Sequence, residues 1–129
     1  MHLDENIEKQ TGLKRTNQII SLRRGAEFFT LKVDEIRYVE NMGRKLIYHS
    51  KTRSTEVYGK ISEVSNCLGD SFYMIHRSYV VNMRYITAYT KQEVTLINGE
   101  KIPMSKYRYK DFVSRYTEYI EEIMNPQRS

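Results

Sequence analysis

The amino-acid sequence predicts a mainly β fold of antiparallel β-sheets, with one short internal helix and a C-terminal helix. Short runs rich in tyrosine and β-branched residues recur along the chain, separated by short polar gaps, and such runs are typical of strands. An Asn-Gly pair between two runs indicates a β-hairpin. Only two segments place apolar residues at helical spacing instead.

The first strand signal follows a polar segment. Residues 1–17 contain too few apolar residues to bury one face of a helix or strand, so we interpret them as an arm, a linker or an expression remnant. From Ile19 onward the pattern changes, and over residues 28–33 every second residue faces a core, the period of a half-buried strand. Similar runs follow at IRYVE (36–40), KLIYH (45–49), YMIHRSYVV (73–81), YITAYT (85–90) and EVTLI (93–97).

The clearest local prediction is a hairpin in the segment VTLINGEKIPM. Both central positions of a type I′ turn need positive φ, which Asn98 and Gly99 tolerate best. Residues 96–97 are therefore expected to pair with residues 101–102. Because Pro103 cannot donate to a ladder, the second strand is expected at a sheet edge or to end there.

Two segments break the β pattern. Ile61, Val64 and Leu68 recur at helical spacing with Gly69 at a C′ position after them, which predicts one short helix. The second predicted helix is C-terminal, with Ser105 as its candidate N-cap. It carries an apolar stripe that packs on the body or on a partner, made of Tyr109, Phe112, Val113, Tyr116, Ile120 and Ile123.

Length and composition predict one domain. A chain of 129 residues with 40% apolar content can bury one core, and we divide it into an arm (1–17), a domain (18–124) and a tail (125–129). The net charge of +5 suits an anionic partner such as nucleic acid or a membrane surface. A single cysteine, Cys67, excludes an internal disulfide and indicates a reducing cytoplasm. No run is long and apolar enough to cross a membrane, and the N-terminus lacks a signal-peptide core.

The sequence does not support a catalytic site. It contains no GxGxxG, GxxxxGK[ST], HExxH or GxSxG motif. His2, His49 and His76 share no metal-ligand spacing with one another or with Cys67. His76 and Ser78 lack the geometry of a base and its nucleophile if they lie on one strand. We therefore expect no enzyme activity, no metal and no cofactor.

Basic residues fall in three groups. Residues 71–92 contain no acidic residue, and two further groups surround the segments NMGRK and SKYRYK. Two interpretations remain open: the groups converge on one surface that contacts phosphates and base edges, or they are separate solvated faces. Stacking of RNA bases on tyrosines is a further alternative, although tyrosines in strands are more often core. The groups are Arg77, Arg84 and Lys91; Arg44, Lys45, Lys51 and Arg53; and Lys106, Arg108 and Lys110.

Four segments in a fixed order support a family resemblance. They are IRYVENMGRKLIYH, the short helix at 60–68, the pattern F-x-x-x-H-R-S-x-x-V-N at 72–82, and L-x-N-G-x-x-I-P-M-S-K at 96–106. In this order and spacing the chain, from about Gln18 to Tyr119, resembles the LytTR family of DNA-binding domains. Members of that family usually form the output half of bacterial response regulators.

The resemblance implies a LytTR-type fold that binds double-stranded DNA through loops entering successive major grooves. It also implies direct repeats as the DNA site and a dimer on that DNA. Carried over by position, the implied DNA contacts are Arg44 and Lys45 in the first loop, His76, Arg77, Ser78 and Asn82 in the second segment, and Lys106 and Arg108 in the third.

This chain departs from the family pattern at three positions. Arg44 stands where other members have histidine, Met74 where arginine is common, and Tyr107 where some members use arginine. Two roles remain open for His76: a DNA contact, or a buried imidazole that positions Arg77.

Together these observations predict a sequence-specific transcriptional regulator, or the DNA-binding output domain of a response regulator. The alternative is a protein-interaction module that keeps the fold and uses the basic surface for an acidic partner. No receiver domain is expected within this chain, because residues 1–17 are too short to form one. The chain is then either a fragment or a stand-alone regulator controlled by a partner protein.

Overall fold

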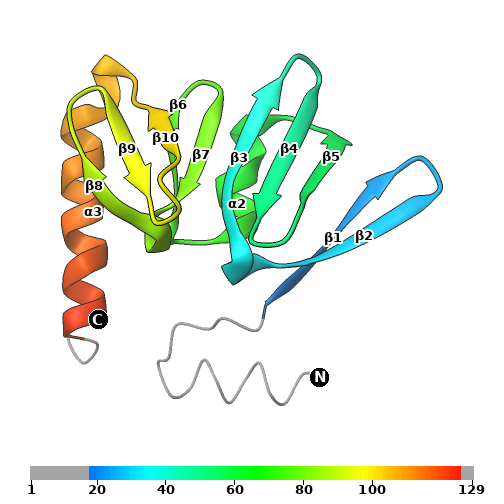
Figure 1. The fold of residues 1–129 in the computed structure, drawn as a ribbon, viewed down its shortest axis with the longest axis horizontal. Coiled ribbons are helices and arrows are strands. Elements are labelled where there is room, and N and C mark those ends of the chain that lie inside the picture. Colours follow the sequence, from blue (N-terminus) through cyan, green and yellow to red (C-terminus); the bar gives the residue numbers. More distant parts are fainter. Residues whose placement is uncertain (1–17, 126–129) are drawn as a thin grey trace.

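The computed structural model describes residues 18–125, which form three antiparallel sheets, α2 (Val64–Leu68) and α3 (Tyr109–Met124) (Figure 1). The predicted arm and most of the predicted tail lie outside the described residues. The strands are β1 (Ile19–Arg24), β2 (Glu27–Lys32), β3 (Ile36–Met42), β4 (Lys45–Ser50), β5 (Ser54–Tyr58), β6 (Phe72–His76), β7 (Tyr79–Asn82), β8 (Ile86–Tyr89), β9 (Glu93–Leu96) and β10 (Lys101–Pro103). The mainly β prediction is confirmed.

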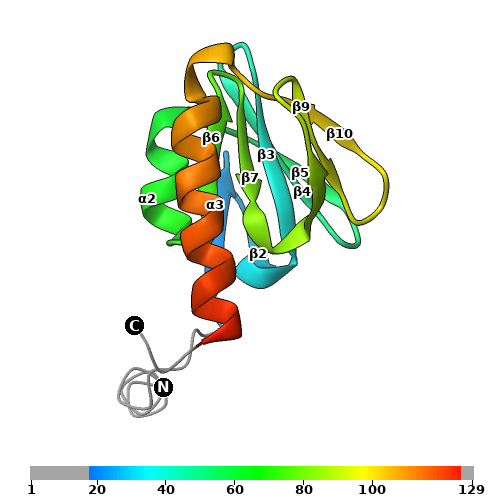
Figure 2. The same ribbon diagram turned by 90° about the vertical axis from the view of Figure 1, so that its left-hand side faces the viewer.

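A five-stranded sheet in the order β5-β4-β3-β7-β6 forms the middle of the molecule. One core lies between this sheet, β2 and α2, and a second lies between its other face, the sheet β10-β9-β8 and α3 (Figures 1 and 2). Successive residues of the middle strands point to opposite faces. Val80 therefore packs in the first core and Val81 in the second, and both are fully buried.

The short helix is confirmed. A 3₁₀ turn (Ile61–Glu63) leads into α2, and Ile61, Val64 and Leu68 are all buried against the middle sheet. Gly69 ends the helix with φ of 108°, a value that side chains with a Cβ rarely adopt.

The run YMIHRSYVV is not one strand, contrary to the sequence prediction. The chain reverses at Arg77 and Ser78, so that His76 pairs with Tyr79 across an antiparallel hairpin of β6 and β7. A strand buried on both faces carries apolar residues at consecutive positions, so the apolar pattern continues on both sides of the turn and conceals it.

The hairpin at the Asn-Gly pair is confirmed, but the type I′ turn is wrong. Gly99 has φ of 90°, whereas no non-glycine residue in the described part of the chain has positive φ, Asn98 included. The loop has three residues, 97–99, and Gly99 N–H donates to the Leu96 carbonyl at 2.8 Å. Lys101 therefore pairs with Thr95, one residue away from the expected register. Pro103 ends β10, the outer strand of its sheet, as predicted.

The C-terminal helix packs on the body of the protein. Phe112 is fully buried in the second core, and Tyr116 stacks on it with ring centroids 5.4 Å apart. Ser105 precedes a 3₁₀ turn (Lys106–Arg108) that leads into α3, but its side chain makes no capping hydrogen bond, so the N-cap prediction holds only for the position. At the other end of the stripe Ile123 is exposed. None of the helices between residues 18 and 125 has the length and apolar character needed to span a bilayer.

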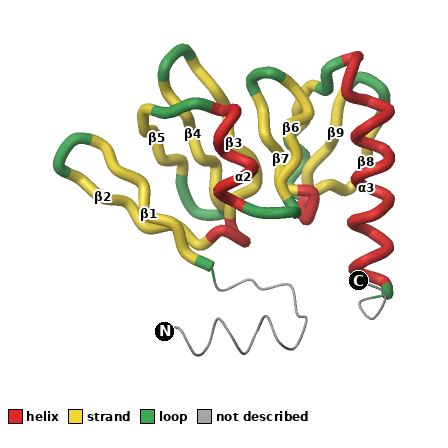
Figure 3. The backbone as a smooth tube through the Cα atoms, turned by 180° about the vertical axis from the view of Figure 1, so that it is seen from behind, coloured by secondary structure: helices red, strands yellow, loops and turns green. Residues whose placement is uncertain are grey.

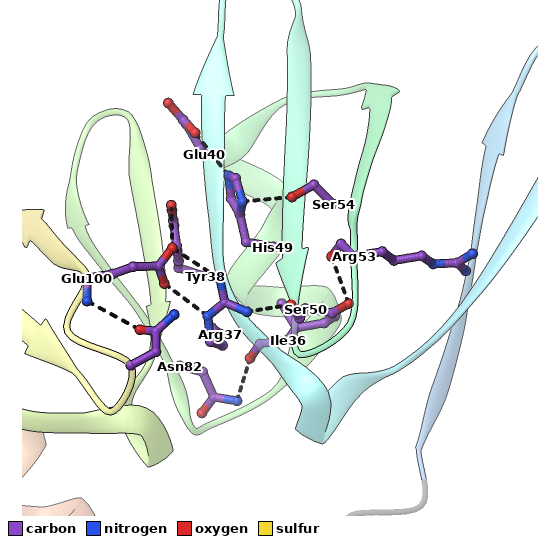
Figure 4. A network of polar contacts seen from close by, with 11 residues as sticks. Ile36, Arg37, Tyr38, Glu40, His49, Ser50, Arg53, Ser54, Asn82 and Glu100 are labelled. Atoms are coloured by element: carbon purple, nitrogen blue, oxygen red, sulfur yellow. Dashed lines mark hydrogen bonds and ion pairs between the residues drawn. The ribbon is translucent and has the colours of Figure 1, made fainter.

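A part-buried ion pair joins the middle sheet to the β9–β10 loop (Figure 4). The guanidinium of Arg37 on β3 donates to both carboxylate oxygens of Glu100, at 2.9 and 3.1 Å, and also to the carbonyl of Ser50. Burial alone would raise the pKa of Glu100, but hydrogen bonds from Arg37 and Asn98 and the charge of Arg37 outweigh it and hold that pKa below its usual value. Glu100 is therefore ionised at neutral pH and fixes the loop to β3.

Replacing Glu100 tests whether its ion pair with Arg37 stabilises the fold. Because its pKa is lowered in the folded state, Glu100 stabilises the fold above its unfolded pKa of about 4.3, and this contribution disappears as the pH falls through the folded value. Glu100→Gln is expected to reduce the free energy of unfolding by about 1–2 kcal/mol at pH 7. In urea denaturation the difference in stability between variant and parent should shrink as the pH falls below about 4.3.

The exposed ion pair of Glu93 with Lys101 offers a matched control on the neighbouring strands. Glu93→Gln should cost no more than about 0.5 kcal/mol at pH 7. Equal losses in the two variants would contradict a special role for Glu100.

Candidate nucleic-acid interface

The basic loops lie along one edge of the molecule. Consecutive antiparallel strands reverse direction, so every second connection returns to the same edge. The β3–β4 turn, the β6–β7 turn and the β10–α3 connection all lie at the top edge in Figure 1. We call this the basic edge, and the predicted contact residues that it carries are Arg44, Lys45, His76, Arg77, Ser78, Lys106 and Arg108.

The first loop presents Arg44 more freely than Lys45. Gly43 has φ of 62°, which permits the tight β3–β4 turn, and Arg44 follows it with an exposed side chain. Lys45 begins β4, and its Nζ lies 3.6 Å from the Glu56 carboxylate on β5. The charge of Lys45 is therefore partly offset, whereas Arg44 projects an exposed guanidinium.

The second loop is held by hydrogen bonds that leave Arg77 exposed at its apex. Ser78 N–H donates to His76 Nδ1 at 3.0 Å, and the imidazole meets the Tyr79 ring edge-on at 5.5 Å between centroids. Asn41 N–H, at the end of β3, donates to the Ser78 carbonyl at 2.8 Å. These contacts connect the second loop to the first, and they assign His76 a part in shaping the turn that presents Arg77.

Asn82 lies away from the basic edge. It ends β7 at the opposite end of the strand, and only 1% of its surface is exposed. Its Nδ2 donates to the Ile36 carbonyl at 2.9 Å, and its Oδ1 accepts from Arg84 N–H at 3.1 Å. A side chain so buried presents no surface to a ligand, so the predicted DNA contact of Asn82 is corrected to a structural role.

The third segment forms an open groove with the second loop, in which Arg77, Lys106 and Arg108 meet. Tyr73 donates its hydroxyl to Asp111 at 2.6 Å across this groove. Burial, then that hydrogen bond, raises the pKa of Tyr73 to about 12, so the hydroxyl stays protonated. Asp111 is the one acidic residue that lines this groove, beside the three basic ones, so the groove keeps an excess of positive charge.

Other basic residues divide between the two edges. Lys51 and Arg53 lie in the β4–β5 connection, at the end of β4 opposite Lys45, where Arg53 donates to the Thr30 carbonyl at 3.2 Å. The sequence grouping of these residues with Arg44 is therefore not spatial. Lys91, in the β8–β9 turn, borders a second groove with Lys106, although the sequence did not place it among the candidate contact residues. Only the count of strand reversals could have placed it there.

The strand tyrosines that could stack on RNA bases differ in exposure, and Tyr58 is 67% exposed. Tyr38 and Tyr48 are buried in the two cores, and burial raises the pKa of each to about 12. At the basic edge Tyr107 is 89% exposed in the 3₁₀ turn that precedes α3 and offers the most accessible ring there.

The fold and the basic edge define a β-type nucleic-acid-binding domain, in which loops and turns rather than a recognition helix present the cations. The chain belongs to the LytTr DNA-binding domain family, whose model matches residues 26–117. This match confirms the family resemblance that the sequence motifs indicated.

Known relatives agree with this assignment. The chain is 33% identical over 85 residues to accessory gene regulator protein A of Staphylococcus aureus, in strains N315, MW2 and MRSA252. The aligned part covers 63% of this chain and 35% of that protein, so the chain spans about a third of the relative's length. A solved LytTr DNA-binding domain of a putative methyl-accepting/DNA response regulator from Bacillus cereus has the same fold, with a TM-score of 0.60 and 20% identity over 87% of this chain and 99% of that one.

The role of His76 can be tested by replacing its imidazole, whose Nδ1 accepts the hydrogen bond from Ser78 N–H. His76→Ala leaves Ser78 N–H without that acceptor and is expected to reduce the free energy of unfolding by about 1 kcal/mol in urea denaturation. Asparagine side chains accept from the N–H two residues on, so His76→Asn should recover most of the stability. If both variants keep full stability but lose DNA affinity equally, the imidazole contacts DNA instead.

Proposed function

We propose that this chain is the DNA-binding unit of a bacterial transcriptional regulator and reads specific sequences of double-stranded DNA through its basic edge. The observation that carries the proposal is the convergence of three sequence-distant loops, with Arg44, Arg77 and Lys106, on one edge of a domain of this family. The family match also makes an acidic protein partner the weaker alternative for this surface.

The spacing of the loops suits a duplex. Neighbouring strands lie about 4.8 Å apart, so the β3–β4 and β6–β7 turns, two strand positions apart in the middle sheet, lie about 10 Å from each other. The third segment extends the row further. An arginine fork matches the two acceptors of guanine in the major groove, whereas lysine serves as a point charge for phosphate. We assign base reading to Arg44 and Arg77 and phosphate contact to Lys45, Lys106 and Arg108.

The relatives indicate how such a unit is used. Their printed names describe an accessory gene regulator and a response regulator, so we propose that a receiver domain or a regulatory partner controls this domain. We also propose that two copies bind direct repeats, which would double the surface in contact with DNA. The proposed location is the cytoplasm, because that compartment holds the DNA of a bacterium. We propose no catalytic activity and no cofactor.

Selection from a random pool of duplexes tests the proposal directly. The full chain should enrich particular sequences at near-physiological salt, and the logarithm of its affinity should fall linearly with the logarithm of salt concentration as counterions are released. Absence of any enriched sequence would overturn the proposal, whereas salt-dependent binding without enrichment would reduce the domain to a non-specific polyanion binder.

Single substitutions separate base reading from phosphate contact. On the best selected duplex, Arg44→Ala and Arg77→Ala should each cost about 1–3 kcal/mol of binding free energy and relax the preference at one defined base position. Titrations against a panel of single-base variants of the duplex measure both effects. Lys51→Ala removes the same charge from the opposite edge and serves as the control. A uniform loss over the whole panel would assign that arginine to phosphate.

A further inference from the structure

A fourth basic turn, between β1 and β2, flanks the middle sheet on the side of β5. The β1–β2 hairpin contacts β5, the outer strand of the middle sheet, and slants outward from it, so that its turn lies beside the sheet and below the β3–β4 turn (Figures 1 and 3). Arg23 and Arg24 end β1 at this turn. The family match begins at residue 26, so neither arginine belongs to the part of the chain that the family covers.

Arg24 attaches the hairpin to the sheet. Its Nη1 donates to the Glu56 carbonyl at 3.3 Å, its Nη2 pairs with Glu27 at 3.4 Å, and its guanidinium lies 4.8 Å from the centre of the Phe29 ring. Glu56 also pairs with Lys45 of the first loop. The hairpin is thereby connected to the basic edge, and both terminal nitrogens of Arg24 bond within the fold.

Arg23 is held in place but leaves its terminal nitrogens available. Its Nε donates to the Gly25 carbonyl at 2.9 Å, and its guanidinium lies 5.9 Å from the centre of the Phe28 ring. Across residues 18–125 no hydrogen bond or ion pair involves the two terminal nitrogens of Arg23. The Phe28 ring beneath it is 67% exposed, so the chain maintains an exposed aromatic support under a solvent-facing cation. Such a support lowers the conformational entropy that an arginine loses on binding.

The geometry points to a phosphate as the ligand of Arg23. We propose that Arg23 contacts the DNA backbone on the flank of the site, beyond the base pairs read by Arg44, and this inference rests on the proposed function. Gly25 and Ala26 at the turn carry no polar side chain, so the hairpin supplies charge without a pattern for reading bases. At about 4.8 Å per strand, the middle sheet spans roughly 19 Å from β5 to β6, and the hairpin and the third segment extend this row on either side toward the length of one turn of B-DNA.

Salt dependence and phosphate ethylation test the contact. Arg23→Gln should lower affinity about fivefold at 0.15 M salt, equally for all sequences, and should reduce the slope of log affinity against log salt by about 0.9. Ethylation of a phosphate on the flank of the selected site, beyond the base pairs assigned to Arg44, should weaken DNA binding by the parent chain but not by Arg23→Gln. Arg23→Lys should retain the salt slope, because it keeps the charge. Lys51→Gln, with the same charge loss at the opposite edge, should change neither slope nor ethylation pattern.

The outcomes separate this inference from the function on which it rests. If the parent chain enriches no sequence, the proposed function fails before Arg23 is tested. If the parent selects DNA but no flanking phosphate is sensitive to ethylation, the inference is overturned, whatever the stability of the variants. It is also overturned if Arg23→Gln, verified as folded by circular dichroism, matches Lys51→Gln in slope and affinity.

Discussion

The middle sheet must bury both of its faces, and the arrangement of the functional groups depends on that requirement. Two separate cores cover opposite sides of the same five strands, with α2 on one side and α3 on the other. Much of the strand surface is therefore occupied by packing. Charged groups that act on a large ligand are then excluded from most strand positions, and the turns at the strand ends are where such groups remain accessible.

The turns at the basic edge are ordered by internal hydrogen bonds. His76 and Asn41 both bond to Ser78 at the turn that carries Arg77, and Glu100 fixes a neighbouring hairpin to β3 from the opposite edge. A loop ordered before binding loses less conformational entropy when it meets DNA. Rigid elements also hold base-reading side chains at a fixed spacing, which is the property that sequence selection requires.

The fold could be predicted where a local pattern determines it, and could not be where tertiary contacts decide. Helical spacing at Ile61, Val64 and Leu68 identified α2, and Asn-Gly located a hairpin, but only the loop conformation showed that the second residue of that pair takes positive φ and the first does not. The candidate site residues also divide into those that the sequence identifies and those that depend on tertiary contacts. Family position identified Arg44 and Arg77, whereas the burial of Asn82 depends on Ile36, 46 residues away in the sequence.

The departure at Met74 has a structural account. Met74 lies in the middle of β6, part-buried, and packs against the core that contains α2, so this chain uses the position for packing rather than for a cation. The positive charge of the second loop is then carried by Arg77 at its apex, with Lys106 across the groove. Because a turn residue can be exchanged without disturbing a core, the base reading proposed for Arg44 and Arg77 can be altered by substitution while both cores stay intact.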